Sequence, residues 1–205
     1  MKRKYERYIN EILYVSYPAP AGQKPFREMF WVDSNDIPSL THHFEIMIIR
    51  RDGVRDGISD VTVIPPNSKF VKEHMKRARS GLPNEPEGEV WPPLFRTKEG
   101  EIVFRGWPMY HTADEVFLFV GTDPDNPTDL GGEVEFWLGC GEDAEKYIIT
   151  KPSCIHIPAG LVHAPIVFRN VRRPFIEIIC YTKPVLDEHA VPVLPPDYKP
   201  PTRKE

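Results

Sequence analysis

The fold expected for this chain follows from one segment, MYHTADEVFLFVG, which runs from Met109 to Gly121. Its second half is rich in β-branched and aromatic residues and is typical of a buried strand. His111 and Glu115 precede that apolar run, and in one straight strand they would lie roughly 13 Å apart, at about 3.3 Å per residue. The intervening Thr-Ala-Asp permits a bend, since aspartate favours turns. With the bend, one strand ends at His111, its antiparallel neighbour begins at Glu115, and both side chains can face one centre. The alternative is that both side chains are solvated at the rim of the fold.

The rest of the chain also favours β-structure. It has 205 residues, enough for one large domain or one domain with an extension. Its 23 prolines are spread through the sequence, and proline interrupts helices and central strands. Short strands joined by stiff turns predict an all-β barrel or sandwich. The strand-like runs are residues 43–50, 61–64, 115–121, 133–139, 146–150, 154–158 and 174–182.

Two segments differ from this pattern. NSKFVKEHMKRARSG has a possible N-cap, a rough apolar stripe and a final glycine, which predict a short helix over residues 68–80. The last twenty residues, LDEHAVPVLPPDYKPPTRKE, are rich in proline and lack periodicity. We expect a C-terminal tail over residues 186–205.

Composition excludes several classes of function. A net charge of −4 gives no basic excess, so nucleic acid is not expected as a partner. No window approaches the ~20 apolar residues of a membrane span, and the N-terminal segment lacks the apolar run of a signal peptide. Three cysteines without metal-type spacing predict reduced thiols and a cytoplasmic location.

A second segment, CIHIPAGLVHAPIVFRN, runs from Cys154 to Asn170. A short strand meets Pro-Ala-Gly, which favours a turn, and His163 follows as the chain re-enters an apolar run. The two segments together resemble the paired motifs of the cupin superfamily, with His111-TAD-Glu115 matching the first motif and PAGLVH, ending at His163, matching the second. The resemblance implies a cupin-type double-stranded β-helix, or jelly-roll barrel, over residues 101–185. It also implies that His111, Glu115 and His163 bind one divalent metal ion.

The chain departs from the family pattern at informative positions. The first histidine of the family's His-x-His pair falls at Met109, and the final asparagine falls at Val167. Two histidines and one carboxylate with open positions suit non-haem Fe(II), and three protein ligands plus water also suit zinc. We expect iron first, with Zn, Mn, Ni or Co as alternatives. His42 or His43 could supply a further imidazole, or have a surface or hydrogen-bonded role.

Residues 1–100 have two interpretations. They form either a β-rich N-terminal extension that adds strands to the barrel or to a dimer partner's sheet, or a degenerate second cupin half. The second interpretation rests on loose alignments of residues 38–49 with 108–119 and of 61–70 with 154–163, in which Phe70 takes the place of the ligand His163.

The resemblance implies a small bacterial-type metal-binding cupin that acts on a small oxygen-rich or aromatic organic substrate. Oxygenase (including dioxygenase), isomerase, lyase and hydrolase chemistry all remain open, because fold does not determine function. The alternative is a cupin that binds or senses a small molecule without turnover. Asp114 could be a general base or second-layer acceptor, or a turn residue; Tyr110 could line the pocket or pack the barrel end. A homodimer is expected.

Overall fold

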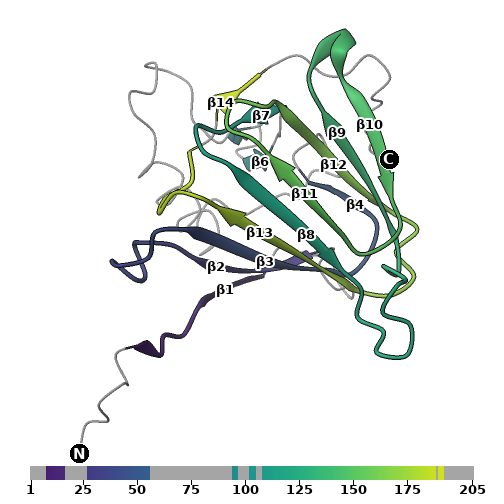
Figure 1. Cartoon of the computed structure of the whole chain (residues 1–205), viewed down its shortest axis with the longest axis horizontal. Helices are drawn as coiled ribbons and strands as arrows, with labels where there is room; N and C mark the ends of the chain where they lie inside the picture. Colours follow the sequence, from purple (N-terminus) through teal and green to yellow (C-terminus); the bar gives the residue numbers. More distant parts are fainter. Residues whose placement is uncertain are drawn as a thin grey trace, which may run out of the picture.

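The computed structural model describes residues 8–16, 27–55, 94–96, 102–104, 108–187 and 189–191. The strand predicted at 61–64 and the helix predicted at 68–80 lie outside these residues. Within them the protein is built from antiparallel strands arranged as two main sheets (Figure 1).

The first sheet, sheet A, has six strands in the order β1-β2-β3-β13-β8-β11, so strands from both ends of the chain lie side by side. Burial alternates regularly along β2, β3 and β13, with every second residue turned into the core. The strands of sheet A are β1 (Leu13–Ser16), β2 (Arg27–Val32), β3 (His43–Ile49), β13 (Phe175–Tyr181), β8 (Glu115–Val120) and β11 (Ser153–Ile157).

The second sheet, sheet B, has the order β10-β9-β12-β7-β14, and β4 also pairs with β12. Its strands are β10 (Glu145–Ile149), β9 (Glu133–Leu138), β12 (His163–Arg169), β7 (Met109–Tyr110), β14 (His189–Ala190) and β4 (Gly53–Arg55). The remaining elements are the paired strands β5 (Leu94–Arg96) and β6 (Ile102–Phe104) and a short 3₁₀ turn, η2 (Gly141–Asp143).

The core lies between the inner faces of the two sheets. Sheet A contributes Phe117 and Phe119, sheet B contributes Phe136 and Phe168, and all four are at most 1% exposed. The chain crosses between the sheets from β8 to β9, from β10 to β11, from β11 to β12 and from β12 to β13. This architecture confirms the predicted all-β, cupin-type jelly roll. Among the described residues, no helix has the length and hydropathy to cross a membrane.

The first strands of the chain extend the same two sheets. β2 pairs with β3, β3 pairs with β13 over its full length, and β4 pairs with β12. The described N-terminal strands therefore contribute directly to the barrel that holds the motif residues. The division at residue 100 stays a prediction.

The chain after β13 folds back on the barrel. Leu186 and Asp187 are buried, and β14 pairs with β7. The amide of Val191 also donates to the carbonyl of Pro108 at 2.7 Å. The start predicted for the C-terminal tail, residue 186, thus falls within the packed part of the molecule.

Candidate metal centre

The bend expected after His111 is present, but the strands on either side of it are not antiparallel neighbours as expected, because the bend carries the chain from one sheet to the other. β7 ends at Tyr110 in sheet B, and β8 begins at Glu115 in sheet A. Because the two strands lie in facing sheets, the side chains on either side of the bend converge. The Nε2 atom of His111 lies 3.2 Å from Oε2 of Glu115.

The third residue is placed by the turn between β11 and β12. Gly160 adopts a φ of +85°, and its amide donates to the carbonyl of His111 at 2.8 Å, so this turn binds directly to the first motif. His163 then begins β12 and pairs with both Met109 and Leu138. Its Nε2 atom lies 3.1 Å from the same Glu115 oxygen.

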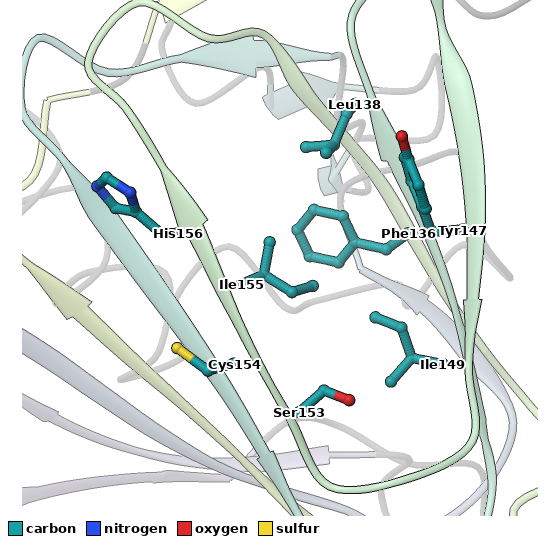
Figure 2. A pocket seen from close by; sticks show the side chains of 8 residues that line it. All are labelled: Phe136, Leu138, Tyr147, Ile149, Ser153, Cys154, Ile155 and His156. Carbon is teal, nitrogen blue, oxygen red and sulfur yellow. The ribbon is translucent and has the colours of Figure 1, made fainter.

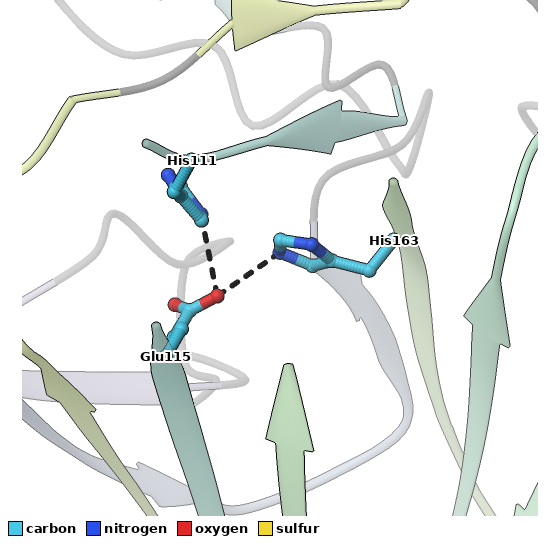
Figure 3. Close-up of side chains that lie close together, drawn as sticks. All are labelled: His111, Glu115 and His163. Atoms are coloured by element: carbon cyan, nitrogen blue, oxygen red, sulfur yellow. Dashed lines mark ion pairs between the residues drawn. The ribbon is translucent and has the colours of Figure 1, made fainter. Parts of the chain in front are cut away.

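Figure 3 shows the three side chains, His111, Glu115 and His163, pointing toward one another from three separate segments. Each is 2–3% exposed, and their donor atoms lie within 4.8 Å of one another. Within the part of the chain that the structure describes, no other trio of histidine, cysteine, aspartate or glutamate side chains comes as close together. We call these residues the triad.

Hydrogen bonds on the far side of each imidazole determine what faces the centre. Nδ1 of His111 contacts the carbonyl oxygen of Asp187, and Nδ1 of His163 lies 3.3 Å from the carbonyl of Leu161. A carbonyl only accepts, so each Nδ1 carries the proton, and a neutral ring presents its Nε2 lone pair to Glu115.

Two lone pairs and a carboxylate oxygen therefore meet at one buried point. Oε2 of Glu115 receives no well-aligned N–H in the structure. Such an arrangement is favourable only with positive charge at the centre, as protons on the rings or as a metal ion. Imidazole and carboxylate are ligands shared by Fe(II), Zn, Mn, Ni and Co, so the triad fits the metal site that the motifs imply.

Two opposing effects act on the carboxyl group of Glu115. Burial by itself raises its pKa, because the charged form loses its hydration. When the rings of His111 and His163 are protonated, their attraction for the carboxylate outweighs burial, so the pKa of Glu115 lies well below the ordinary value and the group is a carboxylate at neutral pH. A deprotonated carboxylate is the form that binds metal.

Aromatic rings surround the triad. Tyr181 lies edge-on to the His111 ring at 5.1 Å, and Phe117 lies edge-on to the His163 ring at 5.9 Å. Both are fully buried. They limit rotation of the imidazoles and exclude water from this side of the centre.

A pocket of about 470 Å³ opens between β11 and the β9–β10 hairpin (Figure 2). Figure 2 shows Phe136, Leu138, Ile149 and Ile155 directed into it, whereas Cys154 and His156 point away. Triad residues are not part of its wall. Ring contacts link the pocket to the triad: Phe117 lies edge-on to the pocket residue Phe136 at 5.1 Å and edge-on to His163 at 5.9 Å.

Asp114 and Tyr110, the other two predicted site residues, have partners away from the triad. The exposed Asp114 carboxylate hydrogen-bonds to His156 at 2.9 Å and to the Ala159 amide at 3.0 Å. These two bonds lower its pKa, with the His156 bond contributing most. The Tyr110 ring stacks on His189 at 4.8 Å, and Tyr110 does not line the pocket described above.

The N-terminal histidines also have other partners. His42 hydrogen-bonds to the Thr41 hydroxyl. His43 is fully buried on β3, where its Nε2 lies 3.1 Å from Glu45, and it is not in the triad group.

Cys154 lies in an apolar run of the sequence, which favours a buried position, but it is exposed. On β11 it is Ser153, Ile155 and Ile157 that turn inward, so Cys154 falls on the outer face.

Sequence reasoning missed Asp187 and Tyr181. Asp187 is 6% exposed, and its carboxylate accepts a hydrogen bond from the Tyr181 hydroxyl. The available signal was the polar run Asp-Glu-His at residues 187–189, which is flanked by apolar residues. The prolines that follow this run favoured a tail instead.

No protein-family model matches the chain, and no curated protein matches it in sequence. Among solved structures, an oxalate oxidase overlaps with a TM-score of 0.42 at 9% identity, covering 84% of this chain and 59% of that one. Oxalate decarboxylase from Bacillus subtilis, whose Mn(II) centres have been characterised, overlaps with a TM-score of 0.43 at 8% identity, covering 84% and 30%.

This chain thus spans 59% and 30% of the length of those two proteins. The class of protein is defined by its own features: two facing antiparallel sheets, the two motifs, and a buried His–Glu–His group that could hold a metal ion. These features agree with the jelly-roll fold and the metal-binding group that the resemblance of the two motifs to those of cupins predicts.

Proposed function

We propose that this protein is a metal-dependent cupin enzyme that holds one divalent ion through His111, Glu115 and His163 and acts on a small organic molecule. The observation that carries the proposal is the convergence of both Nε2 atoms on one Glu115 oxygen at 3.1 and 3.2 Å, in a centre that is 2–3% exposed. Iron is the first expectation, because two histidines and one carboxylate with open positions suit non-haem Fe(II).

The chemistry follows from the number of ligands. Three protein donors leave coordination positions open, and an ion with open positions can polarise a substrate oxygen, lower the pKa of a bound water or, if redox-active, react with dioxygen. The chain's own contribution is to hold the two imidazoles and the carboxylate in place and to exclude water around them. The rings of Tyr181 and Phe117 perform the second task.

The pocket supports a small substrate with an apolar or aromatic part. Its volume falls within the range of small-molecule sites, roughly 300–1,000 Å³. Its wall is mostly aliphatic and aromatic, with hydroxyls from Tyr147 and Ser153. We propose that an apolar part of the substrate occupies this pocket while an oxygen-bearing group reaches the ion past Phe117.

Metal analysis of the purified, reconstituted protein tests the proposal. Elemental analysis should find close to one transition-metal ion per chain in the wild type and loss of most of it in His163→Ala. His156→Ala is the matched control, because His156 lies on the neighbouring strand but is exposed and bonded to Asp114. Equal metal content in wild type and His163→Ala, or no metal in the wild type after reconstitution, would overturn the proposal.

The second candidate is a binding or sensing cupin without turnover. It is favoured by the near-complete burial of the triad and by a pocket whose wall does not include the triad. Calorimetric binding of small aromatic acids to metal-free protein, with affinity unchanged by His163→Ala, would support it. Metal-dependent consumption of such a compound, followed by NMR, would support the enzyme.

The homodimer also stays a proposal. Tyr147 and Ile148 on β10 are 46% and 54% exposed, and β10 ends its sheet with an unpaired edge in the described residues. Apolar side chains on a free strand edge favour association with a second chain. Light scattering coupled to size-exclusion chromatography gives the mass in solution.

A further inference from the structure

The described residues that follow β13, 183–187 and 189–190, are here called the C-terminal strap, and they contact the triad from outside both motifs. The strap leaves β13, turns back, and ends as β14 alongside β7, the two-residue strand that immediately precedes His111. β7 is thereby held on both sides, by His163 of β12 through Met109 and by the strap.

Asp187 forms the centre of the strap. Its backbone carbonyl accepts the Nδ1 proton of His111. Its carboxylate accepts from the Tyr181 hydroxyl, from both the amide and the hydroxyl of Thr112, and from the Lys183 ammonium at 3.3 Å. With 6% exposure, this is a buried carboxylate whose charge is matched by several donors.

These bonds connect the two sheets around His111. Tyr181 belongs to sheet A and pairs with Glu115, whereas Thr112 follows His111 at the end of β7. The Asp187 carboxylate holds both, and so fixes its own carbonyl against His111. His163 differs, because its Nδ1 partner, Leu161, lies in its own turn at 3.3 Å.

We propose that Asp187 is a positioning residue for the metal centre: through its carbonyl it fixes the proton of His111 on Nδ1 and directs the Nε2 lone pair at the ion. This inference rests on the proposed metal site for its effect on affinity, but the tautomer of His111 is a property of the metal-free chain. The residue that orients a metal-bound histidine typically contributes 10–100-fold in metal affinity. The strap would make that contribution from 76 residues away in sequence.

The first measurement needs no metal. Long-range ¹H–¹⁵N NMR of ¹⁵N-histidine-labelled, metal-free full chain at mildly alkaline pH reports which ring nitrogen carries the proton. Wild type should show His111 as the Nδ1–H form, and Asp187→Ala should show the Nε2–H form or a mixture. An Nε2–H form in the wild type, or an unchanged Nδ1–H form in Asp187→Ala, would overturn the inference, whatever the outcome for metal.

The second measurement uses Co(II) as a spectroscopic probe. Asp187→Ala should bind Co(II) about 10–100-fold more weakly and with an altered visible spectrum. Asp187→Asn, which keeps one acceptor oxygen, should recover part of the affinity. Equal affinity and spectrum in wild type and Asp187→Ala would also overturn the inference.

Asp129→Asn is the matched control. Asp129 is another carboxylate with several partners, bonding the Gly131 amide, Arg172 and Arg173 in the loop after β8. The Asp129→Asn variant should have lower stability than the wild type but the same His111 tautomer and the same Co(II) spectrum. If Asp187→Ala fails to fold, Asp187→Asn and Tyr181→Phe carry the same test. A wild type that binds no Co(II) but shows the Nδ1–H form would refute the proposed metal site and leave the assignment of the tautomer to Asp187 standing.

Discussion

Phe117 contacts both the pocket residue Phe136 and the triad residue His163, and replacing it by leucine tests whether the pocket is the route to the metal. Its ring is 1% exposed and contacts Phe136 at 5.1 Å, His163 at 5.9 Å and Phe119 at 6.4 Å. Each such pair contributes about 0.5–1.5 kcal/mol beyond area burial. Because leucine keeps part of the packing, we expect Phe117→Leu to cost about 2 kcal/mol of unfolding free energy.

The effect on access to the metal follows from that cost. If the pocket is the route, a molecule must displace the Phe117 ring to reach the triad. A decrease of about 1.4–2 kcal/mol in the free-energy cost of this local opening would raise the opening rate by about ten- to thirtyfold. The assay is the rate at which 1,10-phenanthroline, a flat apolar chelator, removes Co(II) from the loaded protein, followed by absorbance. Phe117→Leu should release metal faster by that factor.

Phe168→Leu provides the matched control. Phe168 is also 1% exposed and lies edge-on to Phe175 at 5.8 Å, but it is five residues along β12 from His163, roughly 17 Å at about 3.3 Å per residue. It should lose comparable stability in urea unfolding and leave the extraction rate unchanged. Equal acceleration in both variants would show that metal escapes by general unfolding, and no acceleration in Phe117→Leu would refute the route through the pocket.

Two further predictions concern the metal-free protein. Burial raises the pKa of Glu115, but the imidazoles lower it more strongly. The ionised carboxylate therefore contributes its full stabilisation to the fold above the ordinary pKa of 4.5, and this contribution is lost as the pH falls toward the lower pKa of the folded state. Urea unfolding should therefore show wild type losing more stability below pH 4.5 than Glu115→Gln does; parallel losses in both proteins would contradict this assignment. Gly160 has a φ of +85° with open space where a Cβ would be, so Gly160→Ala should cost about 1–2 kcal/mol through backbone strain alone, measured by the same unfolding experiment. A neutral effect would mean that the turn next to His163 relaxes freely.

Much of the barrel could be predicted because its strands are rich in β-branched and aromatic residues. The predicted runs match β3, β8 and β13 closely, although burial alternates there with polar residues such as His43, Glu45 and Glu115 on the inward side. β12 was not among the predicted runs, and the first six residues of HAPIVFR are all buried. β2 begins with Arg27 and Glu28, which suggest a surface segment, yet Arg27 is buried against the sulfur of Met47.

The triad could be predicted because the two motifs resemble those of cupins and each combines a ligand with its own turn. Thr-Ala-Asp bends the chain after His111, and Pro-Ala-Gly bends it before His163. The strap could not be predicted in the same way. Its contact with His111 joins two segments far apart in sequence, and its proline-rich continuation favours a tail.

The precision of the centre is therefore a property of the folded pair of sheets. Each ligand is fixed by a different long-range contact: Glu115 by pairing with Tyr181, His163 by pairing with Met109, and His111 by the carbonyl of Asp187. An unfolded chain cannot hold donors at positions 111 and 163 together, so an ion that binds the triad binds the folded state almost exclusively. The free energy of binding then adds to the stability of the fold, by about 2.7 kcal/mol at an ion concentration one hundred times the Kd. Because the strap and the N-terminal strands belong to the same two sheets, segments that supply no ligand contribute to metal affinity through the stability of the barrel.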